Sequence, residues 1–219
     1  MTISHNASII TNGLALYLDA ANSRSYPGTG TTWTDLSGNG NNGTLTNGTL
    51  YNSSNKGSMS FDGVDDCVVI QNSSSLLSKN NYTKMAWFYA TAYNSNNIIS
   101  SDNGGHAFWL AGGNKLNAGH NGIWSRIYST TTILLNQWYF GAVTFSNTSG
   151  WCLYLNGVLE ATNADTSTWS TDTNINIGSY IPGQNVFTGN ISNIGIYNRV
   201  LTLTEINKNF NALRGRYGI

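Results

Sequence analysis

Residues 58–70, SMSFDGVDDCVVI, read as a strand, an acidic turn and a second strand. Up to Phe61, small or polar residues alternate with apolar ones, which is the period of a strand with one buried face. Gly63 has no Cβ and therefore suits the turn. The run Val68–Ile70 is rich in the β-branched residues that pack on a pleated sheet. This stretch therefore predicts β-structure on both sides of a turn.

The turn itself concentrates negative charge. Asp62, Asp65 and Asp66 are three of the ten acidic residues, in a chain of which only 9% is charged. Two interpretations stay open for this cluster. The carboxylates either cap backbone N–H groups, as in Asx turns, or provide oxygen ligands for a calcium ion.

Composition limits the size and class of the protein. A length of 219 residues suits one domain, residues 1–219, because all-β sandwiches often reach this size. The net charge is zero, and a chain without a basic patch is not expected to bind nucleic acid. No apolar run is long enough to cross a bilayer, and residues 1–18 lack the pattern of a signal peptide. We therefore expect a protein made in a cytoplasm and not inserted into a membrane.

Alternating apolar and polar residues, separated by turn residues, recur along the rest of the chain. Asn156-Gly157 stands between two such runs and is a strong hairpin signal. The alternation slips between Ile191 and Ile194, which indicates a bulge. Further strands are predicted at residues 11–20, 84–91, 98–101, 107–111, 115–118, 124–129, 137–145, 151–155, 158–160, 174–178 and within 186–200.

A helical pattern closes the chain. Thr202 and Glu205 have the spacing of a capping box, and apolar residues recur at helical intervals from Leu203 to Leu213. We expect a short amphipathic helix there, ended by Gly215 and followed by a solvated tail. Many short strands and one helix are arranged most economically as two antiparallel sheets packed face to face. The predicted fold is an all-β, antiparallel two-sheet sandwich with one short C-terminal helix.

The segment FDGVDDCVVI at residues 61–70 resembles the FDG-x-DDYV signature of laminin-G-like, concanavalin A-like jelly-roll domains. Four further segments extend the resemblance over nearly the whole chain: LYLDAANSRSYPGTGTTWTDLSGNGNNGTL (16–45), NQWYFGAVTF (136–145), LYLNG (153–157) and GNISNIGIYNRVLTLTEI (189–206). The first and last of these most resemble domains of bacteriophage structural proteins, including those of cyanobacterial phages. The resemblance implies a jelly-roll sandwich.

The resemblance also implies a function on a virion. The chain would be a structural module that decorates or cements a phage capsid, or belongs to a tail or fibre, and the choice between these positions stays open. It would adhere through loops and edge strands to other virion proteins or to the host surface, as a homo-oligomer. The alternative is a lectin module that binds host-surface glycans for attachment. The two functions are compatible.

Catalysis is not expected. Glycoside hydrolases need two carboxylates about 5 to 10 Å apart across the scissile bond, and no strand here carries evenly spaced acids. The only glutamates are Glu160, after a hairpin, and Glu205, in the helix cap. His5, His106 and His120 have no Ser or Cys arranged as a nucleophile elbow. We expect His106 and His120 to lie exposed at loop edges.

The calcium interpretation would draw on Asn190 or Asn193 as well as the three aspartates, if the last strand runs near the acidic turn. Family members often carry G-x-I-D-D-V where this chain has GNISNI at residues 189–194, so that Ser192 and Asn193 replace both acids. Fewer charges weaken calcium binding. Calcium is therefore the one cofactor considered, at a weak site.

Sugar-binding sites place an aromatic face against the sugar ring and polar groups on its hydroxyls. Four aromatic residues in Asn-dense, loop-rich regions are candidates, although sandwich cores use such residues too: Trp109, Trp124, Tyr128 and Trp169. Trp87 and Trp138 stand in the middle of predicted strands, so we expect them in the core.

Two further features are expected to be structural. Cys67 and Cys152 lie inside predicted strands and are expected as two buried thiols, with a disulfide between adjacent strands left open. The turn-rich segment 22–47 contains only a few large apolar residues, among them Tyr26 and Trp33. The family resemblance implies that this segment covers the sandwich and is pinned by those residues.

Overall fold

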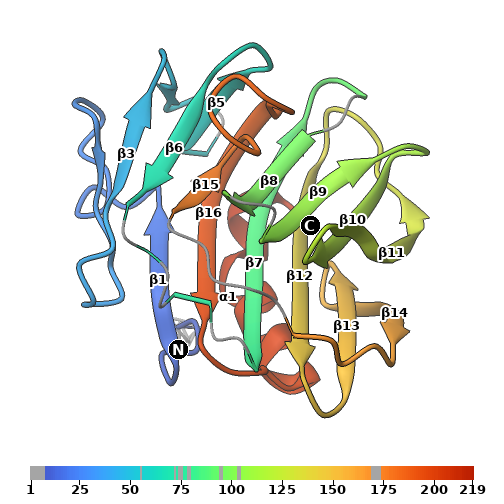
Figure 1. Cartoon of the computed structure of the whole chain (residues 1–219). Coiled ribbons are helices and arrows are strands. Elements are labelled where there is room, and N and C mark those ends of the chain that lie inside the picture. The colour runs from blue at the N-terminus through green and yellow to red at the C-terminus, as the bar shows by residue number, and fades with distance from the viewer. Residues whose placement is uncertain are drawn as a thin grey trace.

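The computed structural model describes residues 8–54, 56–71, 73, 76–77, 80–93, 96–102, 105–168 and 174–219. The described residues form two eight-stranded antiparallel sheets, packed face to face, and one helix behind the first sheet (Figure 1). The predicted all-β, two-sheet sandwich with a C-terminal helix is thus confirmed.

The first sheet has the strand order β14-β13-β12-β7-β16-β5-β4, with β1 paired to the second half of β16. Its strands are β1 (Leu14–Asp19), β4 (Leu50–Asn52), β5 (Ser58–Asp62), β7 (Asn81–Ala90), β12 (Trp138–Ser146), β13 (Gly150–Leu155), β14 (Val158–Asn163) and β16 (Thr188–Tyr197).

The second sheet has the order β11-β10-β9-β8-β15-β6-β3-β2 and lies in front in Figure 1. Its strands are β2 (Thr32–Trp33), β3 (Gly43–Thr46), β6 (Cys67–Ile70), β8 (Asn96–Ser101), β9 (His106–Ala111), β10 (Lys115–His120), β11 (Ile123–Thr132) and β15 (Ile175–Ile177).

The stretch that predicts the fold joins the two sheets. β5 pairs with β16 in the first sheet, whereas β6 pairs with β15 and β3 in the second. The acidic turn between them is therefore the corner at which the chain changes sheets. Phe61 and Val68, on either side of this corner, both point into the main core between the sheets. The predicted bulge is also present, because the pairing of β16 with β7 shifts between Ile191 and Asn193.

Helix α1 (Leu203–Tyr217) covers the outer face of the first sheet through a second, aromatic core. The Trp87 ring lies 4.0 Å from the ring of Tyr217 and 5.7 Å from that of Phe210, in stacked geometry. Trp87 and Trp138 are both buried, as expected, and they lie under the helix.

The helix is longer than the sequence predicts. The capping box of Thr202 and Glu205 is present, but the helix continues through Gly215 to Tyr217 and ends at Gly218. The expected solvated tail is wrong for a physical reason. Arg216 forms a two-pronged ion pair with the buried carboxylate of Asp19, at 2.7 and 3.0 Å, and Tyr217 packs on the first sheet.

The remaining expectations have mixed outcomes. Segment 22–47 is pinned by the buried Tyr26 and Trp33, although it also contributes the short strands β2 and β3. Cys67 and Cys152 are free thiols, and Cys152 is only partly buried. Among the described residues, no helix has the length and hydrophobicity to cross a bilayer.

Candidate functional site: an aromatic pocket on the second sheet

A pocket of about 140 Å³ opens on the outer face of the second sheet. Strands β8, β9 and β11 and the loop after β15 form it. Its lining residues are Asn97, His106, Ala107, Trp109, Trp124, Tyr180 and Asn185. Two of the predicted sugar-binding residues, Trp109 and Trp124, are therefore brought together.

Trp124 is held over the sheet by its backbone. The indole N–H of Trp109 donates to the Trp124 carbonyl at 3.0 Å. Beneath this part of β11 lies Gly119, where an added Cβ would come within 1.9 Å of the Ile123 carbonyl oxygen. Only a residue without a side chain lets the start of β11 pass this close to β10.

The opposite wall comes from the loop at residues 178–187. The ring centres of Tyr180 and Trp124 are 6.3 Å apart, with the planes at 51°. Polar side chains on the outer face of the sheet hold this loop: Ser100 Oγ donates to the Ser179 carbonyl at 2.5 Å, and Asn176 Nδ2 donates to the Tyr180 carbonyl at 2.7 Å. Asn97 Nδ2 donates to the Asn185 carbonyl at 3.2 Å. The aromatic wall is thus held on a braced loop.

A row of side chains extends from the pocket across the sheet. Asn97 on β8 pairs with Trp109 on β9, Trp109 with Asn117 on β10, and Asn117 with Tyr128 on β11. Residues paired across strands lie on the same face, so Tyr128 stands two strands from Trp109, about 10 Å away. Its side chain is 61% exposed. The fourth candidate, Trp169, lies outside the described residues.

The expectation of exposed histidines is wrong, because His106 and His120 are buried between the sheets. The Tyr82 ring lies 4.8 Å from that of His106. His120 Nε2 donates to the Ser167 carbonyl at 2.6 Å, so its Nδ1 is left to accept from the Tyr82 hydroxyl at 3.2 Å.

The same cluster contains a buried lysine. Lys84 Nζ donates to the Ala107 carbonyl at 3.2 Å and lies 5.6 Å from the centre of the Tyr82 ring. Burial, reinforced by the Lys84 charge, holds the pKa of His106 well below its usual value. Burial likewise lowers the pKa of His120 to about 4. Both imidazoles are therefore neutral at pH 7.

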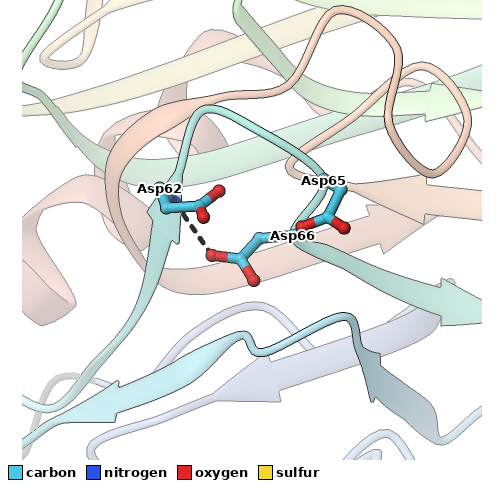
Figure 2. A group of neighbouring side chains, drawn as sticks. All are labelled: Asp62, Asp65 and Asp66. Atoms are coloured by element: carbon cyan, nitrogen blue, oxygen red, sulfur yellow. Dashed lines mark hydrogen bonds between the residues drawn. The ribbon is translucent and has the colours of Figure 1, made fainter.

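The acidic corner brings three carboxylates together (Figure 2). Asp62, Asp65 and Asp66 have ligand oxygens within 4.8 Å of one another. Two of these oxygens already accept backbone hydrogen bonds: Asp62 Oδ1 from Val64 N at 2.7 Å, which is an Asx turn, and Asp66 Oδ2 from Asp62 N at 2.9 Å. Burial raises the pKa of Asp66, and its two acidic neighbours raise it further.

The two asparagines proposed as further calcium ligands have other surroundings. Asn190 Oδ1 accepts from Ser58 Oγ at 3.3 Å. Asn193 is fully buried in β16, where its register partner on β1 is Asp19. With one ligand oxygen from each, the three aspartates provide three of the six to eight oxygens that calcium takes, so water would have to complete the shell. A weak calcium site at the corner stays a prediction.

The sequence pattern of the concanavalin A-like lectin/glucanases superfamily matches residues 61–207. The chain belongs to this superfamily. No curated protein matches the sequence.

Solved structures with the same concanavalin A-like fold include domain 4 of an extracellular arabinanase from Geobacillus stearothermophilus, in complex with arabinotriose. It is 18% identical, with a TM-score of 0.68 over 89% of this chain and 96% of that one. The receptor-binding domain of a botulinum neurotoxin C/D mosaic is 19% identical, with a TM-score of 0.70 over 92% of this chain and 52% of that one. A Trypanosoma rangeli sialidase is 16% identical, with a TM-score of 0.70 over 97% of this chain and 35% of that one.

Sequence reasoning missed several parts of the pocket in this concanavalin A-like chain. Tyr180 and Asn185 come from a loop with no periodic signal, and Asn97 lies in a polar run. Gly119 had a readable signal, since a glycine inside a strand often marks close approach of another backbone.

Proposed function

We propose that this chain is a glycan-binding module and that the pocket on the second sheet is its binding site. The observation that carries the proposal is the lining itself: two tryptophans and a tyrosine surround one small pocket edged by two asparagine amides. Aromatic faces pack against the C–H faces of sugar rings, while amides pair with hydroxyls.

The size and polar groups of the pocket suit a single sugar ring. A volume of about 140 Å³ is below the range of about 300–1,000 Å³ typical of larger ligands. Asn97 Nδ2 donates to the Asn185 carbonyl, so Asn97 Oδ1 remains as an acceptor for a hydroxyl of the ligand. The side chain of Asn185 is exposed at the rim. A second ring of the same glycan would lie toward the exposed Tyr128, while Asn117 between Trp109 and Tyr128 is only 4% exposed.

Two similar structures support the proposal. The arabinanase domain was solved with arabinotriose, and the neurotoxin domain is described as receptor-binding. Both have the fold of this chain.

A glycan array followed by calorimetry tests the proposal. Wild-type protein is expected to bind a subset of glycans, and Trp124→Ala to lose roughly fivefold or more in affinity, because stacking contacts of this kind contribute about 1 kcal/mol or more. Leu50→Ala, at an exposed position on β4 of the other sheet, is the matched control and should bind normally. An empty array at high protein concentration would overturn the proposal.

We propose that the module does not cleave its ligand. Neither glutamate is placed as a catalytic acid. Glu160 accepts from both Thr130 and Thr131, which joins β14 to β11, and Glu205 pairs with Arg199 at 2.6 Å. Release of reducing sugar from any glycan that the protein binds would contradict this.

We further propose a place on a phage particle, which rests on the resemblance of residues 16–45 and 189–206 to phage structural proteins. There the module would attach the virion to host glycans or to other virion proteins, as a homo-oligomer. Mass spectrometry of purified virions should detect the chain, and light scattering should give a mass above the 23.7 kDa of one copy. Absence from virions would remove the first claim, and a monomer would remove the second.

A further inference from the structure

From the charges around the pocket we infer that it selects an uncharged sugar ring and disfavours sialic and uronic acids. This inference rests on the proposed function and adds the class of glycan.

The lining residues that the structure describes provide hydrogen-bonding groups but no formal charge. The polar residues among them are Asn97, Asn185, Tyr180, the two tryptophans and His106, and the indole N–H of Trp109 is already donated to the Trp124 carbonyl. The ring of His106 itself lies on the inner side of β9 against Tyr82, fully buried, and its depressed pKa keeps the imidazole neutral. A neutral hydroxyl can pair with amides of this kind at little cost, because each partner replaces a hydrogen bond to water.

Among the residues that the structure describes, three cations stand close to these elements, and each is engaged elsewhere. Lys115 on β10 donates to the Thr130 carbonyl on β11. Lys84 reaches the Ala107 carbonyl from the inner side of β9, between the sheets, where it also lies 5.9 Å from the Phe108 ring centre. The strand separates it from a ligand on the outer face. Arg126 on β11 pairs with Asp165 at 2.6 Å.

A carboxylate in the pocket would therefore lose water without gaining a cation. Burying an ionised group without a paired charge is strongly unfavourable, whereas proteins that recognise carboxylates commonly place a two-pronged Arg against them. The long-range attraction of Lys84 acts across the β9 backbone and cannot supply a hydrogen bond to the ligand.

The test compares glycans in pairs that differ only by an acidic group, for example galactose with galacturonic acid, and the methyl ester of sialic acid with sialic acid itself. An array first identifies which type of sugar ring binds. The best neutral ligand and its matched acid are then titrated by NMR together with these pairs. We expect the neutral member to bind at least roughly tenfold more tightly. Equal or tighter binding of the acidic member would overturn the inference and leave the proposed function standing. Failure of every glycan to bind would overturn the proposed function itself.

A charge variant gives a second, independent readout. Asn185→Lys places a cation at the exposed rim and should reduce the ratio of the affinities for the neutral and the acidic member of each pair. Asn185→Gln is the matched control, because Asn185 has a positive φ of 50° and both replacements bear the same backbone cost. If Lys and Gln variants discriminate alike, the absence of a cation does not set the selectivity and the inference is wrong.

Discussion

The buried histidines make the stability of this protein sensitive to mild acid. His120 is 2% exposed and is neutral in the fold, since burial lowers its pKa to about 4, whereas an unfolded histidine titrates near 6.5. Between these two values the unfolded chain binds the proton and the folded chain does not. The unfolding free energy that depends on neutral His120 is therefore fully present above about pH 6.5 and is lost as the pH drops toward 4.

The size of the effect follows from the two pKa values. Lowering the pH from 7 to 5 should cost about 2 kcal/mol of unfolding free energy through His120 alone. His106, whose pKa is also depressed by burial and by Lys84, adds to the loss in the same direction. At pH 5 most carboxylates stay ionised, so their titration contributes little in this window.

Urea unfolding at pH 7 and pH 5 measures the effect, with His120→Gln as the test variant. This variant loses ring contacts with Trp151, 4.6 Å away, and will be less stable at both pH values. The informative quantity is the difference between the two pH values, which should be about 2 kcal/mol smaller in the variant than in the wild type. Equal differences in the two proteins would show that His120 does not titrate as described.

Three further predictions test other parts of the structure. Gly119→Ala should abolish sugar binding in calorimetry, since its Cβ would meet the Ile123 carbonyl at 1.9 Å; unchanged affinity would contradict the described path of β11. Tyr217→Ala should lower the unfolding free energy by about 3 kcal/mol, because its ring stacks 4.0 Å from that of Trp87; a loss below about 1 kcal/mol would mean that the helix end is not docked. Calcium at millimolar levels should give a weak heat that Asp66→Asn removes; no heat, and no melting shift with EDTA, would leave only the Asx turn.

The alternation of residue types predicted the sandwich because period-2 patterns determine which face of a strand is buried. It could not predict which sheet a strand joins. The run 58–70 gives two strands and a turn, but only pairing with β16 and β15, more than a hundred residues later, places β5 and β6 in different sheets. Such pairings depend on contacts distant in sequence.

The candidate site was predictable in part for the same reason. Trp109 and Trp124 could be selected as aromatic residues in polar surroundings, whereas Tyr180 joins them only through the fold of a distant loop. The burial of His106 could have been predicted from the sequence. His106 stands in phase with Phe108 and Leu110, both buried in the core, so the strand period extended by one residue points its ring inward. The end of the helix could not be predicted, because it depends on the ion pair between Arg216 and Asp19, which lie at opposite ends of the chain.

The central claim is that glycans bind at the aromatic pocket, and the indole N–H signals of the seven tryptophans test it most directly. An NMR titration with a neutral oligosaccharide that the array selects should shift the signals of Trp109 and Trp124 with a common saturating curve. The signals of the buried Trp33, Trp87 and Trp151 should stay in place. Saturable shifts that leave Trp109 and Trp124 unmoved would place the binding site elsewhere and contradict the account.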